Sequence, residues 1–122
     1  MLYPERAPGA LQPLQWSILR FLEHRAPEEA TVSAVARFIG ISHAPVSRSI
    51  QTLCKKGLLS PIKCGTSRRS NAYALTPEGA RMMQADPFLR LKAGFSHLDE
   101  KSRAEFERQL RHIVISLAKE NE

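Results

Sequence analysis

The chain has 122 residues, 43% of them hydrophobic, and a formal net charge of +6 at pH 7. This length suits one domain, or one domain with a dimerisation appendage, and this hydrophobic content excludes wholesale disorder. No apolar run reaches the roughly 20 residues of a membrane span, and the N-terminus lacks a signal-peptide pattern, so we expect a cytoplasmic protein without a membrane partner. Two cysteines are too few for a disulfide scaffold.

Three helices are predicted in the first half of the chain. Residues 1–10 are expected to form an arm, and apolar residues at helical spacing predict a helix over 11–25, ended by Pro27. Thr31 is expected to cap a second, short helix that ends at Gly40. The apolar positions of this second helix are Val32, Val35, Ala36, Phe38 and Ile39.

A third helix is expected to begin after Ser42 as its N-cap and to run to about Lys56, with Gly57 just beyond its end. Pro45 falls at the third helical position, where a missing N–H group has no helical partner to lose. Val46, Ile50 and Leu53 are expected to face the core. A short turn with a glycine between two helices is the helix-turn-helix unit.

The remaining segments predict a β-hairpin and further helices. Residues 58–63 and 71–75 have extended character and flank the basic segment CGTSRRS, which indicates a hairpin with a long loop, the wing. Thr76 and Pro77 restart a helix toward Gln84, Asp86-Pro87 interrupts it, and more helical segments follow, the last over about Asp99–Lys119.

The predicted fold is therefore mostly α with a small β-hairpin, an α+β winged helix-turn-helix with C-terminal dimerisation helices. We expect an arm at 1–10, a DNA-binding domain at 11–85 and a helical dimerisation region at 86–122.

Positive charge is concentrated in the expected DNA-binding unit, which consists of the helix-turn-helix and the wing. Residues 30–77 contain seven basic side chains and no acidic one, whereas the rest of the chain has eleven basic and twelve acidic residues. Evenly spread surface charge would not give this distribution. Concentrated charge on a helix-turn-helix and wing is typical of phosphate contacts with nucleic acid.

The stretch VSAVARFIGISHAPVSRSIQTLCKKGLLSPI, followed by SRRSNAYALTPEG, resembles the MarR family of bacterial regulators. The resemblance implies a homodimer on a palindromic double-stranded DNA operator, with helix 42–56 in the major groove and wing 64–70 in the minor groove. It also implies repression, and release by a small-molecule effector that the sequence does not identify. Three features depart from the family pattern: Ser67 replaces an acidic residue two positions before Arg69, the N-terminal arm is short, and Asp86-Pro87 breaks a usually long helix.

The candidate DNA-binding residues lie on the third helix and the wing. N-terminal residues of a recognition helix reach base edges, and Arg48 suits either a guanine or a phosphate. Arg68 and Arg69 at the wing tip suit a narrow minor groove. Lys55 and Lys63 are expected near phosphates, with simple solvation as the alternative. The candidates on the recognition helix are Ser42, His43, Ala44, Ser47 and Arg48.

An apolar stripe on the last helix predicts a dimer interface, with folding back within one chain as the alternative. Its residues are Phe106, Leu110, Ile113, Val114 and Leu117. Cys54 is expected to pack in the core and Cys64 to lie near basic residues, so a redox switch is a minor hypothesis.

No metal site, cofactor or enzyme activity is expected, because the four histidines lack metal-ligand spacing and no catalytic motif is present. The alternative function is a winged-helix protein-interaction adapter that does not read DNA sequence.

Overall fold

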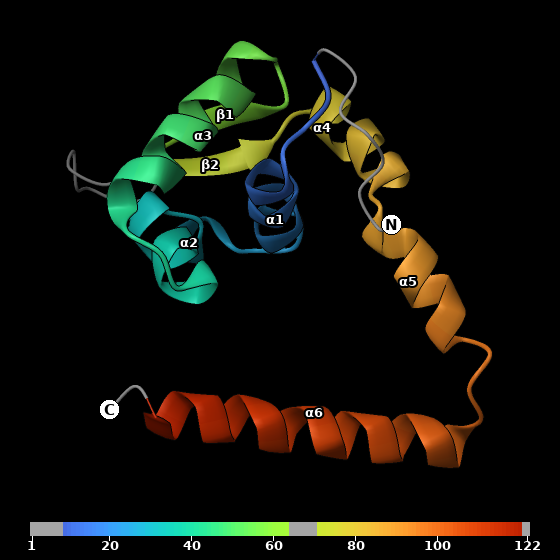
Figure 1. The fold of residues 1–122 in the computed structure, drawn as a ribbon. Helices are drawn as coiled ribbons and strands as arrows, with labels where there is room; N and C mark the ends of the chain where they lie inside the picture. The colour runs from blue at the N-terminus through green and yellow to red at the C-terminus, as the bar shows by residue number, and fades with distance from the viewer. Residues whose placement is uncertain (1–8, 64–70, 121–122) are drawn as a thin grey trace. The chain divides into compact units, whose positions relative to one another are not determined.

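The computed structural model describes residues 9–63 and 71–120. In chain order the elements are α1 (Pro13–Leu22), the 3₁₀ helix η1 (Pro27–Glu29), α2 (Val32–Ile39), α3 (His43–Lys55), β1 (Leu59–Ile62), β2 (Ala72–Leu75), α4 (Pro77–Met82), the 3₁₀ helix η2 (Met83–Ala85), α5 (Phe88–Phe95) and α6 (Glu100–Glu120). The chain divides into two compact units after Asp86. The predicted fold class, mostly helical with one antiparallel hairpin, is confirmed (Figure 1).

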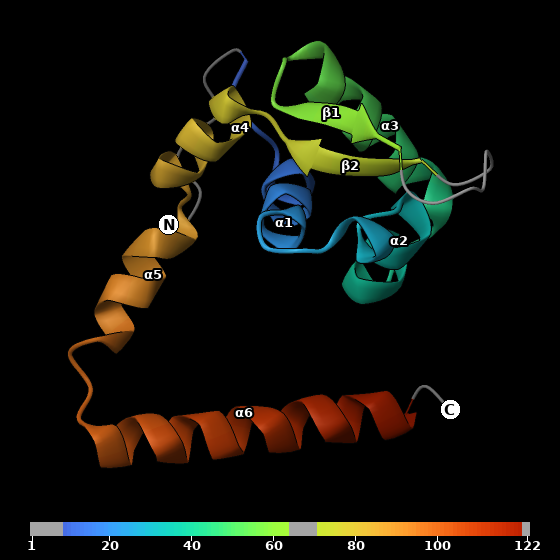
Figure 2. The same cartoon turned by 180° about the vertical axis from the view of Figure 1, so that it is seen from behind.

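The core of the first unit lies among α1, α2, α3 and the hairpin. Helix α1 contacts α3 and β2, and α3 also contacts α2 and β1. Both ribbon views show the hairpin beside these helices (Figure 2). Burying six large aliphatic side chains to 1% exposure or less fixes how the three helices pack. These side chains are Ile18, Leu19, Val35, Val46, Ile50 and Leu53.

Helix α1 ends at Leu22, three residues earlier than predicted. Between Leu22 and Pro27 the chain has no large apolar residue to bury, and a residue before proline is disfavoured in the helical region. Ala26 accordingly adopts φ −65° and ψ 151°. The prediction that Pro27 itself stops the helix was therefore wrong in its position.

The turn between α2 and α3 follows the predicted glycine signal. Thr31 caps α2 by accepting a hydrogen bond from the Ala34 N–H (3.1 Å). Gly40 has φ +82°, a left-handed conformation that side chains disfavour. The N–H groups of Gly40 and Ile41 both donate to the Ala36 carbonyl, which ends α2 and redirects the chain into α3.

Phe38 does not face the core as the other apolar positions of α2 do, and it is 66% exposed. It lies in the last turn of the helix, where its ring packs 4.9 Å from that of Phe21 at the end of α1. The guanidinium of Arg25 lies 4.4 Å from the centre of the Phe21 ring. Phe38 therefore contributes to a cation–aromatic cluster at the edge of the unit.

The hairpin is held to the helices on both sides. Its register pairs Leu59 with Leu75 and Ile62 with Ala72. The Tyr73 N–H donates to the Ala30 carbonyl (3.0 Å), so the segment before α2 extends the sheet. The hairpin is thus fixed to the core along the edge that faces the start of α2.

The junction from β2 to α4 explains the sequence Thr76-Pro77-Glu78-Gly79. The Thr76 hydroxyl donates to the Gly57 carbonyl (2.6 Å) and accepts from the Gly79 N–H (3.0 Å). The Thr76 N–H donates to the Leu58 carbonyl (3.1 Å). Gly79 is needed because a Cβ there would overlap that carbonyl oxygen.

The second unit contains α5 and α6, whose Phe95 and Phe106 rings pack 5.0 Å apart. The Ser102 N–H donates to Asp99 Oδ1 (2.7 Å) at the start of α6, and this hydrogen bond lowers the pKa of the Asp99 carboxyl. The first turn of the last helix is therefore acidic, with Glu100 directly after Asp99. The predicted apolar stripe on α6 is exposed within the single chain, at 47–57% for Phe106, Leu110, Ile113, Val114 and Leu117.

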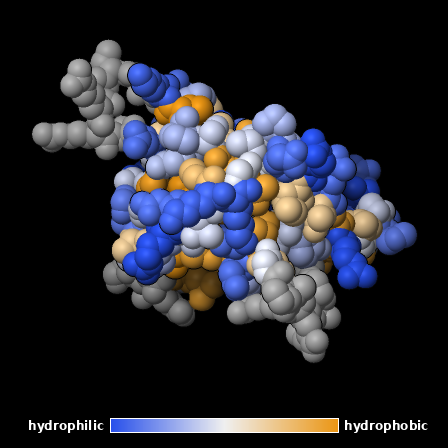
Figure 3. Space-filling view, turned by 90° about the horizontal axis from the view of Figure 1, so that it is seen from above, coloured by the Kyte–Doolittle hydropathy of each residue, from blue (hydrophilic) through white to orange (hydrophobic). Residues whose placement is uncertain are grey.

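Within the described residues, no helix combines the length and the apolar character needed to cross a bilayer. The same residues contain no cluster of three or more potential metal ligands. Hydrophilic side chains surround smaller hydrophobic areas on the face drawn in Figure 3.

Candidate nucleic-acid interface

Helix α3 has a buried face and an opposite, outward face. Val46, Ile50 and Leu53 are at most 1% exposed and lie against the core. On the other face, at the i, i+4, i+7 and i+11 spacing of one helical stripe, lie four exposed residues. These residues, here called the α3 stripe, are Ala44, Arg48, Gln51 and Lys55.

Arg48 is the central cation of the α3 stripe. Its side chain is exposed and has no hydrogen bond or ion pair with any other described residue. Besides the hydrogen bonds within the helix, its backbone carbonyl accepts the Thr52 hydroxyl (3.1 Å). A guanidinium that is not used inside the protein retains all five donors for an external acceptor.

The N-terminus of α3 is also open to solvent. Ser42 occupies the N-cap position with extended backbone, as predicted, but its side chain makes no capping hydrogen bond. The usual donors to a cap are the N–H groups of the second and third helical residues, and one of the two is missing here because the third residue is Pro45. The exposed Ser42 hydroxyl and the N–H groups of His43 and Ala44 therefore face solvent at the positive end of the helix dipole.

The other candidates on α3 differ in how they are placed. Ser47 is half-buried at the side of the helix, whereas His43 is exposed. Lys55 is exposed on the α3 stripe. Its neighbour Lys56 donates through Nζ to the Gly9 carbonyl (3.2 Å) and is thereby engaged with the N-terminal segment.

The wing candidates are only partly within the described structure. Lys63 is exposed directly after β1. Arg68 and Arg69, together with Ser67 and Cys64, lie outside the described residues. Their assignment to the minor groove remains a prediction.

Two features were missed by sequence reasoning. Gln51 shares the α3 stripe with Arg48, and its i+3 spacing was a signal that could have identified it. The second feature is an ion pair between Arg20 on α1 and Asp86, for which no local pattern exists because the two residues are 66 positions apart.

Cys54 lies on the inner side of α3, partly buried against the core. Burial raises the pKa of its thiol. A thiol with a raised pKa is less often the reactive thiolate, so this environment favours packing over oxidant sensing.

The family comparison agrees with this geometry. The model of the MarR family matches residues 11–70, which include α1 through β1 and the wing segment. Over these residues, just under half of the chain, the sequence is similar to the MarR family. A search of the curated proteins found no match.

Solved structures share the fold at low sequence identity. A MepR–DNA complex from S. aureus has a TM-score of 0.71 at 20% identity, over 88% of this chain and 80% of that one. A MarR transcriptional regulator from Methanosarcina mazei Go1 has a TM-score of 0.71 at 22% identity, over 92% of this chain and 81% of that one. FabT of Streptococcus pneumoniae in complex with DNA has a TM-score of 0.70 at 18% identity, over 89% of this chain and 77% of that one. These likenesses establish that the fold, including its C-terminal helices, is that of known winged-helix proteins.

Proposed function

We propose that this protein is a sequence-specific transcriptional regulator that binds a palindromic double-stranded DNA operator as a homodimer. Helix α3 enters the major groove of each half-site, and wing 64–70 enters the adjacent minor groove. The observation that carries the proposal is the α3 stripe, an exposed row centred on an unengaged arginine, opposite a fully buried face. Two of the structural neighbours are themselves complexes with DNA.

Each candidate has a distinct role in this proposal. Arg48 forms a forked contact with guanine O6 and N7 or with a phosphate, and Gln51 suits adenine N6 and N7. Ser42 and the N–H groups of His43 and Ala44 bind a phosphate at the helix N-terminus. Ser47 contacts the DNA from the side of α3. Lys55 and Lys63 contact the phosphate backbone of the DNA and so position the protein without reading its sequence. Arg68 and Arg69 read the width of the minor groove.

The absence of acidic side chains strengthens this assignment. No Asp or Glu occurs between Glu29 and Glu78, so no carboxylate within that stretch repels a phosphate or neutralises Arg48. Elsewhere two arginines of α6 are paired on their own helix, Arg108 with Glu105 (2.6 Å) and Arg111 with Glu107 (2.6 Å). Because these positive charges are neutralised within α6, the electrostatic attraction for DNA is concentrated at α3 and the wing.

The homodimer is assigned to α6. A helix must bury its apolar stripe, and five large apolar side chains of this stripe are about half exposed in the single chain. A second copy of α6 and its neighbours supplies the complementary apolar surface with two-fold symmetry. A dimer that occupies an operator also blocks access to the promoter, so we propose that the protein acts as a repressor.

The test is a selection of bound sequences from a random duplex library at a stated salt concentration, followed by titration of the selected duplex. We expect an enriched palindrome. Arg48→Ala is expected to reduce the ratio of specific to non-specific affinity by about 1–3 kcal/mol if Arg48 reads a base. Lys92→Ala, on α5, is the matched control and should leave the ratio unchanged. The absence of any enriched sequence would contradict the proposal.

A further inference from the structure

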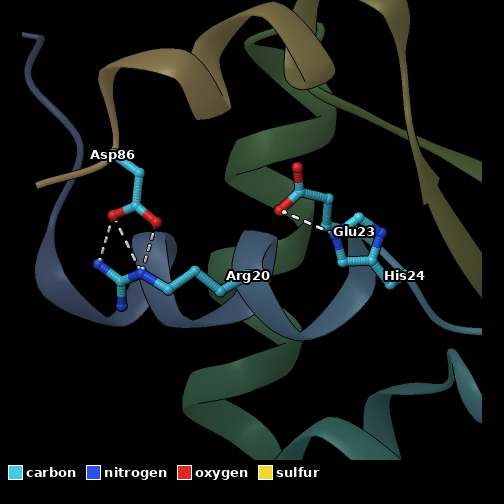
Figure 4. A network of polar contacts seen from close by, with 4 residues as sticks. All are labelled: Arg20, Glu23, His24 and Asp86. Carbon is cyan, nitrogen blue, oxygen red and sulfur yellow. Dashed lines mark hydrogen bonds and ion pairs between the residues drawn. The ribbon is translucent and has the colours of Figure 1, made fainter. Parts of the chain in front are cut away.

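Arg20 on α1 forms a two-pronged ion pair with Asp86. The Arg20 Nε donates to Asp86 Oδ2 (2.8 Å), and the Arg20 Nη2 donates to Asp86 Oδ1 (2.8 Å). Figure 4 shows the guanidinium and the carboxylate meeting edge to edge. The two side chains are only 18% and 6% exposed. By contrast, the contact between Glu23 and His24 in the same view is 3.8 Å long, and His24 is 86% exposed.

The ion pair lies where the chain leaves the winged-helix unit. Asp86 is the last residue of that unit, and its φ of −59° and ψ of 122° interrupt the helical path between η2 and α5. Pro87 follows and is also buried. Arg20 lies beside Ile18 and Leu19, two of the most buried core residues. The break in the helix is therefore tied directly to the rigid part of α1.

A buried ion pair is weak evidence for stability, because well-packed apolar residues often stabilise equally well. Its forked geometry gives directional specificity instead. We infer that the Arg20–Asp86 pair is a positioning contact. It fixes the point and direction in which the chain leaves the winged-helix unit, and so sets the separation of the two α3 helices in the dimer. This inference rests on the proposed function, in which that separation determines the half-site spacing.

The first arm of the test needs no DNA. Spin labels at the exposed positions Glu23 and Lys92 are introduced in a full chain carrying Cys54→Ser and Cys64→Ser, diluted with unlabelled chain. The distance distribution is then measured by pulsed electron resonance. We expect Asp86→Asn to broaden the distribution.

Two further variants make this arm decisive. Arg81→Gln breaks the exposed ion pair with Glu78 on α4 (2.7 Å) and should leave the distribution unchanged. Arg20→Lys keeps both charges and preserves folding, but replaces the fork by a point charge, so broadening is also expected here. If the Asp86→Asn protein does not fold, the distance distribution of the Arg20→Lys protein alone tests the inference. A wild-type distribution in the folded variants would overturn the inference.

The second arm measures affinity for a single half-site and for palindromes whose half-sites are separated by one or two additional base pairs. We expect Arg20→Lys to keep its half-site affinity and to lose about tenfold of the preference for the best spacing. An unchanged spacing preference would overturn the inference. If the wild-type protein prefers no palindrome at all, the proposed function fails instead, and the spin-label arm still tests the positioning contact independently.

Discussion

Replacing Gly79 by alanine is expected to destabilise the winged-helix unit. A Cβ on Gly79 would overlap the carbonyl oxygen of Leu58 and lie 3.1 Å from its carbonyl carbon. Both atoms belong to the backbone, so no side-chain rotation relieves the overlap. The same oxygen accepts the Thr76 N–H, and therefore any shift that admits the methyl group weakens the junction between β2 and α4.

The magnitude follows from three opposing effects. Overpacking in a well-packed site costs about 1–3 kcal/mol, and the weakened hydrogen bond costs about 1 kcal/mol. Alanine regains about 1 kcal/mol because it is a better helix former than glycine. We therefore expect the free energy of unfolding to fall by about 2 kcal/mol, which for a unit of this size lowers the urea midpoint by about 2 M.

The assay is urea unfolding followed by the fluorescence of Trp16, the single tryptophan, which is 7% exposed on α1. Gly94→Ala is the matched control, since a Cβ on Gly94 of α5 meets nothing within 4 Å. The control should leave the Trp16 midpoint at its wild-type value. A Gly79→Ala protein as stable as wild type would refute the steric reasoning.

Three further variants test the cap, the charge and the dimer. Thr31→Ala should lower the free energy of unfolding by about 1 kcal/mol, measured in urea; an equal loss in the exposed Ser33→Ala control would argue against capping. Lys63→Ala should reduce the slope of log affinity against log salt by about 1, and an unchanged slope would remove Lys63 from the phosphate contacts. Leu110→Glu with Val114→Lys keeps a favourable helical pair but should give monomers in sedimentation. A surviving dimer would place the interface elsewhere.

Local chemistry made much of the fold predictable. Thr31 and Thr76 cap helices, and Gly40 and Gly57 adopt positive φ, because each signal depends on residues within four positions of it. The hairpin likewise follows from two short extended runs. These features were confirmed without any knowledge of tertiary contacts.

Longer-range and competing effects were not predictable in the same way. The pairing of Arg20 with Asp86 depends on how the residue that follows η2 comes to lie beside α1, which no local pattern encodes. Ser42 was expected to cap α3, but Pro45 removes one of the two donors that a cap uses. On the candidate site, the charge pattern indicated the basic segment that contains α3, and the outward face of this helix is exposed, whereas the DNA contacts themselves remain predictions.

The central claim is tested most directly by titrating a selected palindrome, its single half-site and a scrambled duplex with the wild-type protein at several salt concentrations, with the stoichiometry measured by sedimentation. We predict two chains on each palindrome, and a preference of about a thousandfold or more over the scrambled duplex. Equal affinity for the palindrome and the scrambled duplex, in folded and dimeric protein, would contradict a sequence-reading regulator.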